Sequence, residues 1–282
     1  MALLLHSMFE FWPIIEKILK LSDAKLVTEI GSENATTTKA LCDWAVLDKA
    51  CRIISVDVKP DEQLLALAKD FKQLKVLAKS SLEVLPELPV QDIYLIDGDH
   101  NYYTVYSELQ KIHEKSVAHG HPVIIILHDV GWPCARRDLY YYPSLIPESF
   151  RQPFSFDMGI TLDNSGLISG GFRGESAFAC AEKEGGPRNG ILTAIEDFMG
   201  QNPVYEFDKI DAVFGLGIMI SDQHPVKVLV TDCITSYSGN FLLSTLERNR
   251  LELFLRVIAL QDEVLELKKS QDSSISPSTP SQ

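Results

Sequence analysis

Basic side chains are scarce in this sequence. Its 282 residues include 26 Lys and Arg against 39 Asp and Glu, which gives a formal net charge of −13 at pH 7. Affinity for the phosphate backbone of nucleic acids comes mainly from Lys and Arg, so this balance argues against a general nucleic-acid-binding protein. A small anionic substrate needs only a local basic patch and remains compatible with the sequence.

Cysteine pairs and long apolar runs are also missing. The five cysteines include no CxxC pair, which disfavours a zinc or dithiol site, and an odd, dispersed set is typical of reduced thiols in the cytoplasm. No apolar run approaches the ~20 residues that span a bilayer. The N-terminal segment lacks a basic leader and a small-residue cleavage site. We therefore expect residues 1–24 to form an amphipathic helix whose Phe9, Phe11 and Trp12 pack on the core or on a partner subunit.

What the sequence does contain is a regular alternation of apolar runs and helical patterns. Five short apolar runs predict strands, at Leu26–Ile30, Arg52–Val58, Lys75–Ala78, Asp92–Ile96 and Pro122–Leu127. The segments between them predict helices, roughly at 37–49, 61–71 and 102–118. Strands that are apolar throughout and joined by helices indicate a parallel sheet covered on both faces. The predicted fold is therefore a doubly wound, Rossmann-like α/β fold, whose ligands bind at the carboxyl ends of the strands.

Beyond the fifth strand the pattern loosens. Residues 131–186 are rich in Gly, Pro, Tyr and Arg and show little periodicity. We interpret them as an insertion that forms a lid or a substrate-binding loop; an extra hairpin packed on the sheet is the alternative. A helix at 190–200 and closing strands at 205–208 and 215–221 complete a predicted domain of residues 25–223.

The C-terminal part is predicted to be helical over residues 224–270. Leucines recur there every seven residues, and a companion apolar series is interrupted by Arg250; the two series are Leu246, Leu253, Leu260 and Leu267, and Leu243, Val257 and Val264. This heptad seam fits a homodimer formed through residues 242–268, or a helix that folds back on its own domain. Residues 271–282 are rich in Ser and Pro and are expected to be disordered.

Two carboxylates at predicted strand ends indicate a nucleoside ligand. Glu29 precedes Gly31 and Ser32 in a tight turn before a helix, where backbone amides can approach a ligand closely. Asp57 ends the second strand, where its carboxylate can accept hydrogen bonds from both ribose hydroxyls. Each feature alone also fits an ordinary turn or a helix cap. A second and third glycine are absent from the turn, which argues against a nicotinamide dehydrogenase.

A second group of polar residues follows the next two strands. The fourth strand ends in Asp97, within LIDGDHNYY, and the fifth ends in His128 and Asp129. Two acids at neighbouring strand ends repel one another unless a cation or a proton is shared, so we predict a divalent metal site at these three residues. Carboxylates with several waters suit Mg²⁺, and the imidazole admits Mn²⁺, Fe²⁺ or Zn²⁺. Asp99 more readily caps the following helix.

The chain resembles class I S-adenosylmethionine-dependent methyltransferases of methyltransferase family 24. The resemblance rests on the order and spacing of five segments, EIGS, SVD, SSLEVLPEL, LIDGDHNYYTVYSEL and ILHDV. It covers about residues 25–130 and continues more loosely through GWPCARRDLYYYPSLIP and GGPRNGILTAIEDF. Relatives of that family include catechol O-methyltransferase, macrocin O-methyltransferase and cephalosporin-hydroxylase-like proteins.

The resemblance implies S-adenosylmethionine as the cofactor and a divalent cation, Mg²⁺ first. The implied cofactor-binding residues are Glu29, Gly31, Ser32, Asp57, Ser81, Leu82 and Asp97, and the implied metal ligands are Asp97, His128 and Asp129. The sequence departs from the family at three places. His128 and Asp129 replace an acid–amide pair, His100 stands where the family has a catalytic lysine, and Ala35 stands where it usually has glycine.

His100 and a segment rich in Arg and Tyr complete the candidate residues. Imidazole titrates near neutral pH, so His100 is predicted to be the general base; a helix-terminal residue bonded to the backbone is the alternative. Arg136, Arg137 and Tyr140 are predicted to grip a polyhydroxyl or anionic substrate, or else belong to a surface loop.

The activity expected from the sequence is metal-assisted O-methylation of a sugar or natural-product hydroxyl, glycosides included, in the cytoplasm. Two alternatives stay open. One is a hydroxylase-like enzyme with the same fold. The other is a catalytically degenerate methyltransferase-fold protein that binds a nucleoside or scaffolds partners. Likeness at the level of the fold does not fix a substrate.

Overall fold

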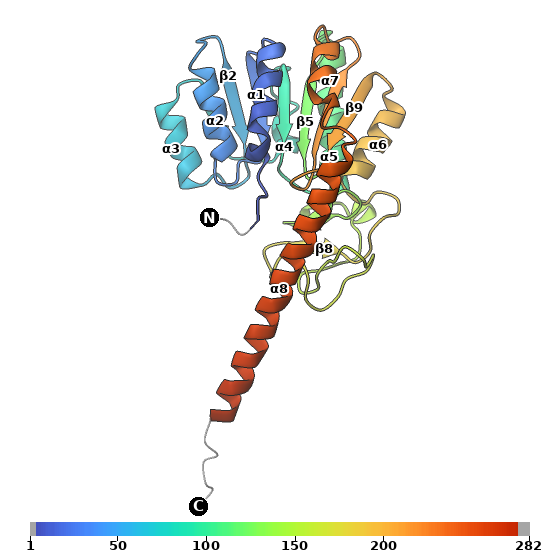
Figure 1. Cartoon of the computed structure of the whole chain (residues 1–282). Helices are drawn as coiled ribbons and strands as arrows, with labels where there is room; N and C mark the ends of the chain where they lie inside the picture. The colour runs from blue at the N-terminus through green and yellow to red at the C-terminus, as the bar shows by residue number, and fades with distance from the viewer. Residues whose placement is uncertain (1–3, 276–282) are drawn as a thin grey trace, which may run out of the picture.

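A computed structural model describes residues 4–275 and shows an α/β fold built on a seven-stranded sheet (Figure 1). The strand order is β3-β2-β1-β4-β5-β10-β9. The strands are β1 (Leu26–Ile30), β2 (Arg52–Val56), β3 (Leu74–Leu77), β4 (Ile93–Ile96), β5 (Ile124–His128), β9 (Tyr205–Ile210) and β10 (Leu216–Ser221). The first five are parallel, and β10 runs antiparallel to both of its neighbours. The predicted doubly wound fold is confirmed.

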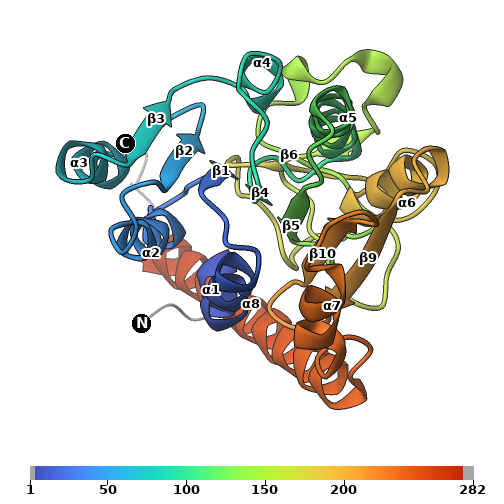
Figure 2. The same ribbon diagram turned by 90° about the horizontal axis from the view of Figure 1, so that it is seen from above.

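Helices cover both faces of this sheet (Figure 2). One face carries α1 (Trp12–Leu21), α2 (Thr36–Ala45), α3 (Glu62–Asp70) and α7 (Lys227–Thr235), and the other carries α4 (Ser81–Val84), α5 (Tyr102–His119) and α6 (Ile191–Gln201). Side chains of one strand alternate between the two cores: Ile124 and Ile126 of β5 belong to the first, and Ile125 and Leu127 to the second. Burial on both faces explains why the strands are apolar throughout.

The start of α5 places the end of the DGDH segment beside the sheet edge. The side chain of Asn101 accepts a hydrogen bond from the backbone N–H of Thr104 at 2.9 Å and caps the helix, which ends at Gly120 in the left-handed conformation, φ +58°. His100 is therefore held in the short connection between β4 and the first turn of α5.

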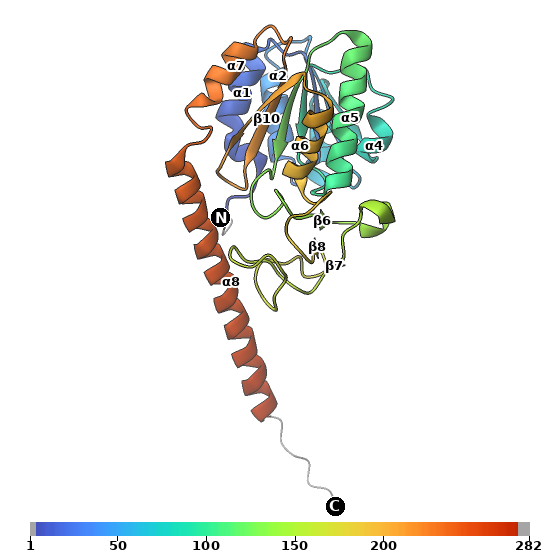
Figure 3. The same cartoon turned by 90° about the vertical axis from the view of Figure 1, so that its right-hand side faces the viewer.

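The insertion after β5 forms a small sheet beyond the carboxyl ends of the main strands (Figure 3). Its strand order is β6-β8-β7, with β6 (Leu139–Tyr140), β7 (Phe154–Ser155) and β8 (Ala179–Ala181), and it includes the 3-10 helices η2 (Pro143–Leu145) and η3 (Glu148–Phe150). Another 3-10 helix, η1 (Met8–Phe11), leads into α1. The insertion thus covers the edge of the sheet at which ligands are expected.

The C-terminal region differs in detail from the sequence prediction. Val230 and Ile234 of α7 lie in the core beside α1, so this helix belongs to the main domain and not to an extension. The long helix α8 (Phe241–Ile275) continues into the segment expected to be disordered, of which residues 276–282 lie outside the described residues. In the described part of the chain, no helix is both long and apolar enough to cross a membrane.

Candidate functional site

A cavity of about 420 Å³ opens at the carboxyl ends of β4 and β5, beneath the insertion. Three of the predicted residues line it: Asp97, His100 and Asp129. Much of the remaining lining is aromatic or apolar, and comes from Leu4, Pro133, Leu139, Tyr141, Phe172, Phe178, Phe214 and Phe254. The main sheet, the insertion and α8 therefore all contribute residues to the lining of this cavity.

Two carboxylates and two imidazoles form a compact cluster at this edge. Nδ1 of His128 lies 3.2 Å from Oδ1 of Asp97 and 3.5 Å from Oδ1 of Asp129. Nε2 of His100 lies 3.0 Å from Oδ2 of Asp129 and 3.7 Å from Oδ1 of Asp97. The convergence predicted from the parallel strand ends is therefore present, and His100 joins it from the start of α5.

The charges of this cluster balance one another. Burial by itself lowers the pKa of His128, but the carboxylates of Asp129 and Asp97 outweigh it and raise that pKa to about 9. Burial also lowers the pKa of His100. Its neighbours, Asp129 foremost, outweigh burial and raise that pKa well above its usual value. Burial raises the pKa of Asp97, but the two imidazoles lower it by more, so the net pKa lies below the usual range. At neutral pH both imidazoles are therefore protonated on both nitrogens, and the carboxyl group of Asp97 is ionised.

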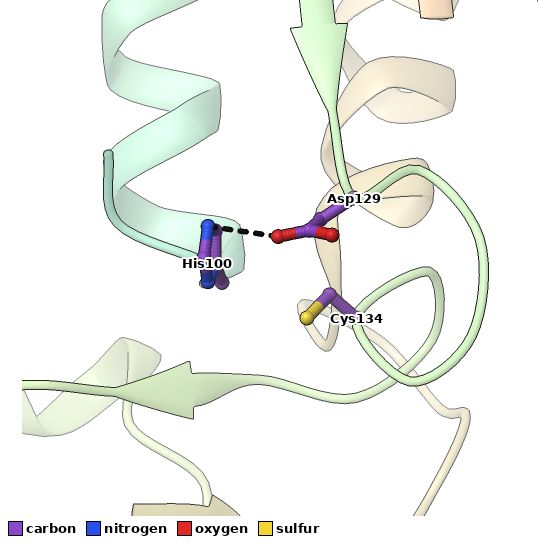
Figure 4. A group of neighbouring side chains, drawn as sticks. All are labelled: His100, Asp129 and Cys134. Carbon is purple, nitrogen blue, oxygen red and sulfur yellow. Dashed lines mark ion pairs between the residues drawn. The ribbon is translucent and has the colours of Figure 1, made fainter. Parts of the chain in front are cut away.

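The same atoms form two overlapping groups of metal-ligand type. Donor atoms of Asp97, His128 and Asp129 lie within 4.8 Å of one another, and so do those of His100, Asp129 and Cys134 (Figure 4). Nε2 of His128 donates to the carbonyl oxygen of Val213 at 2.9 Å, which turns Nδ1 toward the carboxylates. The donor atoms of the three predicted ligands lie close enough to share one ion, which would bind Nδ1 of His128 in place of its proton. Cys134 was missed because a lone cysteine in an irregular segment gives no sequence signal.

Gly31 fits the backbone of β1 tightly against the end of β4. Its φ is +81°, and a Cβ added there would lie 2.2 Å from the carbonyl oxygen of Asp97. Two non-glycine residues of the same turn, Glu33 and Ala35, also have positive φ, of 41° and 57°. The turn thus keeps left-handed backbone at positions without glycine, at a cost of about 1–2 kcal/mol each. Glu33 also lines the cavity.

The other carboxylates predicted to bind cofactor are partly engaged within the protein. Oδ2 of Asp57 accepts hydrogen bonds from the backbone N–H and hydroxyl of Ser32, at 3.1 and 3.0 Å. Glu29 is buried, and one of its oxygens accepts from the hydroxyls of Thr38 and Ser55 at 2.5 and 3.0 Å, while Oε1 has no partner. Burial raises the pKa of Glu29 to about 7. Oδ1 of Asp57 accepts from the backbone N–H of Lys59 at 2.8 Å, so Asp57 holds the turn with both oxygens, whereas Glu29 braces β1, β2 and α2.

Ser81 and Leu82, predicted near the adenine, form the first turn of α4. The hydroxyl of Ser81 donates to Oε1 of Glu108 on α5 at 2.5 Å. Glu108 is fully buried, and burial raises its pKa to about 8. A carboxyl group that stays protonated near neutral pH makes stability depend on pH.

Glu108→Gln is expected to flatten the pH dependence of stability. The folded protein retains the Glu108 proton up to about pH 8, whereas the unfolded chain releases it near the ordinary glutamate pKa of 4.5. Between these values folding takes up a proton, so wild-type stability falls as pH rises, by about 1.4 kcal/mol per pH unit for this group. Urea unfolding at pH 5, 6, 7 and 8 measures the slope. Gln at Glu114, an exposed position of the same helix, should leave it unchanged; equal slopes in all three proteins would contradict the assignment.

The structure does not bring the three predicted substrate residues to the cavity. Arg136 pairs with Glu196 of α6 at 2.6 Å, on the surface. Arg137 is fully buried and donates to the carbonyl oxygens of Ala181 and Ser165, so it holds the insertion together. Tyr140 is buried too, whereas its neighbour Tyr141 lines the cavity, with its ring centroid 5.8 Å from that of His100. Alternation along the short strand β6 and its continuation explains why adjacent tyrosines differ.

Asp138 ties the insertion to the main domain and was not predicted. Its carboxylate accepts hydrogen bonds from the backbone N–H of Tyr102 at 2.8 Å, from that of Gly190 at 2.7 Å and from the hydroxyl of Tyr140 at 2.7 Å. Tyr102 and Gly190 stand at the starts of α5 and α6. The N–H of Leu139 also donates to the carbonyl oxygen of His100 at 2.9 Å. Negative charge at the start of a helix is favourable, so the Asp138 carboxylate stabilises both helix starts. Together these hydrogen bonds fix the position of His100 relative to the insertion.

Comparison with solved structures finds two methyltransferases among its matches. One is a protein assigned as a caffeoyl-CoA O-methyltransferase of Staphylococcus aureus, with 13% identity, a TM-score of 0.41, and coverage of 74% of this chain and 81% of that one. The other is the SAH-bound methyltransferase PaMTH1 of Podospora anserina, with 13% identity, a TM-score of 0.43, and coverage of 74% and 76%. No family model and no curated protein matches the chain.

The strand order itself defines the class of fold. Five parallel strands in the order 3-2-1-4-5, followed by an antiparallel hairpin whose last strand, β10, lies between β5 and the edge strand β9, form the methyltransferase-like version of the Rossmann sheet. The protein therefore has a methyltransferase-like fold with a cavity at the carboxyl edge of its sheet. What the site does is argued below from its own residues.

Proposed function

We propose that this protein is an S-adenosylmethionine-dependent methyltransferase of the family 24 type that acts on a hydroxyl group of a small molecule. The observation that carries the proposal is the cluster of Asp97, His100, His128 and Asp129 beside the Gly31 turn, facing a cavity of about 420 Å³. Groups that bind a nucleoside and groups that move a proton then lie at one edge of the sheet, as methyl transfer to oxygen requires.

The turn and the ends of β1 and β2 are the residues that would hold the cofactor. Both oxygens of Asp57 are engaged, Oδ2 with Ser32 and Oδ1 with the backbone N–H of Lys59 at 2.8 Å, and their remaining lone pairs are the acceptors proposed for the ribose hydroxyls. Ser81 and Leu82, which form the first turn of α4, are proposed to contact the adenine. The bound cofactor would supply an electrophilic methyl group; the chain has to orient the acceptor and take up its proton.

Within the protein, His100 is the proposed general base. Its imidazole lines the cavity, and Asp129 lies 3.0 Å from its Nε2, where the carboxylate stabilises the protonated ring. Asp97, Asp129 and His128 would hold a divalent cation, Mg²⁺ first, which lowers the pKa of a hydroxyl bound to it. His128 lies behind the two carboxylates, anchored on Val213.

The residues that line the cavity favour a natural product over a sugar as the acceptor. Among the described residues that line it, five are aromatic and none is Lys or Arg. Aromatic rings bind flat, largely apolar groups by stacking and edge contacts. We therefore propose a neutral acceptor whose hydroxyl is borne on an aromatic or apolar skeleton; a glycoside would enter through its apolar part.

Calorimetric titration with S-adenosylmethionine, with and without Mg²⁺, tests the cofactor. We expect binding, no binding of NAD, and about tenfold weaker binding or more in Asp57→Asn, because one charged acceptor of the ribose is lost while an oxygen remains for Ser32. Asp61→Asn, at the cap of α3, is the matched control and should bind as the wild type does. Unchanged affinity in Asp57→Asn would remove Asp57 from the site.

A second candidate function has one specific observation in its favour. Glu33 and Ala35 occupy left-handed positions of the cofactor turn, and the Glu33 side chain points toward the cavity that it lines. An added carboxylate there favours a degenerate domain that binds another ligand or scaffolds partners. Absence of S-adenosylmethionine binding, with and without metal, would support this candidate over methyl transfer.

We also propose a reducing, cytoplasmic location for the protein. The five cysteines are buried and unpaired. Burial raises the pKa of Cys42 and Cys180 to about 12 and that of Cys134 well above its usual value. Such thiols are unreactive, in keeping with packing roles in a chain that forms no disulfide.

A further inference from the structure

Helix α8 uses one face to hold the body of the protein. The carboxylate of Glu247 accepts hydrogen bonds from the backbone N–H groups of Val213 and Phe214, at 3.0 and 2.9 Å, in the turn between β9 and β10. Leu251 is buried, and Asp262 forms a two-fold ion pair with Arg173 of the insertion, at 2.7 and 3.0 Å. The inner face of α8 is thus satisfied by its own domain.

The heptad leucines lie on another face of the same helix and are left exposed. Exposed fractions are 57% for Leu246, 60% for Leu253, 43% for Leu260 and 63% for Leu267. Figures 1 and 3 show α8 running past the body, with its C-terminal part projecting free of it. The helix folds back on its domain through its inner face and, near its start, through Leu243 of the companion series, whereas the leucine series takes no part in that contact. An apolar stripe of this length on a projecting helix stays exposed to water unless another molecule covers it.

Arg250, which interrupts the companion series, does not disrupt this stripe. Its guanidinium is bonded to Glu247 at 2.6 and 2.7 Å and to the carbonyl oxygen of Leu5 at 2.8 Å, and it lies over the ring of Phe214. The side chain is therefore turned toward the body. Its polar group is already satisfied there, and the exposed seam continues past it along the leucines.

We infer that this seam pairs with the same seam of a second copy of the chain as a parallel two-stranded coiled coil. A period of seven residues matches a helical partner with the same period, because each knob must meet a hole on the facing helix. A stripe that is identical in both chains is self-complementary about a two-fold axis. The bodies, which occupy the inner face of each helix, lie on the outside of the pair.

Charge favours the parallel arrangement. Glu263 and Lys268 flank the seam on opposite sides, five residues apart, and both are exposed. In a parallel, in-register pair, each Glu263 faces Lys268 of the second copy, the usual relation between flanking positions of a coiled coil. Within one chain Glu263 has a loose contact with Arg256, 3.7 Å, which leaves the carboxylate free to turn across the interface.

Sedimentation velocity of the full chain tests the pairing, with two matched variants. Leu260→Glu places a charge in the seam, and Leu265→Glu places it on an exposed leucine outside the seam (43% and 52% exposed). We expect dimers for the wild type and for Leu265→Glu, and at least a tenfold weaker association for Leu260→Glu. Because both leucines are exposed in the single chain, circular dichroism should show equal folding. A monomeric wild type, or equal association of the two variants, would overturn the inference.

Cysteine crosslinking tests the orientation. Val264→Cys lies in the seam and Glu266→Cys lies outside it, and the native cysteines are buried. Oxidised glutathione should convert Val264→Cys to a disulfide-linked dimer and leave Glu266→Cys monomeric on a denaturing gel, because equal positions meet only in a parallel pair. A dimeric wild type whose Val264→Cys variant fails to crosslink would overturn the parallel arrangement. Neither experiment uses S-adenosylmethionine, so their outcome is separate from that of the proposed activity.

Discussion

Alanine at Gly31 is expected to lower the free energy of unfolding by about 3–5 kcal/mol. The added Cβ would lie 2.2 Å from the carbonyl oxygen of Asp97 and 2.6 Å from Cα of Gly98. Both are backbone atoms, so the contact cannot be relieved by rotating a side chain, and β1 or β4 has to move. The left-handed φ adds its own cost. Urea unfolding measures the loss, and the same displacement should weaken any ligand bound through Asp97.

Gly120→Ala is the matched control for this experiment. Gly120 ends α5 with φ +58°, also left-handed, but an added Cβ would meet nothing within 4 Å. It should therefore cost only the conformational part, about 1 kcal/mol. If the two variants lose the same stability, the close approach of β1 and β4 has no energetic weight and the account of the turn is wrong.

Alanine at His100 is expected to slow methyl transfer by a factor of about 10²–10⁴ at saturating substrates, the usual contribution of a positioned general base. Asp129 and Asp97 raise the pKa of His100 well above its usual value, against the effect of burial. The imidazole therefore starts protonated at neutral pH, and the wild-type rate should rise with pH as that proton is lost. The variant should lack this rise.

Measurement of S-adenosylhomocysteine formation from pH 6 to 10, with an acceptor found by screening, tests the role of His100. His119→Ala is the control, since His119 is exposed at the far end of the same helix. A His100→Ala variant that keeps the wild-type rate and pH profile would assign the proton transfer to another group. Retained cofactor binding in His100→Ala would separate the expected loss of rate from a folding defect.

The sequence predicted the parts of the site that depend on regular structure. Asp97 and Asp129 follow neighbouring parallel strands, and the carboxyl ends of such strands meet at one edge, so their convergence follows from the strand pattern alone. The bounds of β1 were also predicted correctly, because its apolar run is short and ends at a glycine turn. The proximity of His100 follows from the short connection between β4 and α5.

The sequence could not place the residues of the insertion. Arg137 and Tyr141 are close in the chain, yet the arginine is buried against backbone carbonyls and the tyrosine lines the cavity. No sequence periodicity distinguishes the buried arginine from the cavity-lining tyrosine, because the insertion contains only two- and three-residue strands. Phe254 of α8 reaches the cavity through a tertiary contact with Phe172, 6.2 Å between ring centroids, that no local pattern encodes.

The carboxylate of Asp138 has a consequence for how the cavity opens. It joins the first turns of α5 and α6 to the insertion through two hydrogen bonds, from the backbone N–H groups of Tyr102 and Gly190. An insertion that swung outward on a hinge as a rigid lid would leave buried backbone amides of both helices without an acceptor, at about 1–3 kcal/mol each. We therefore expect bulky ligands to exchange by fraying of segments that lack such bonds, with the layer next to His100 staying in place while the outer loops of the insertion loosen.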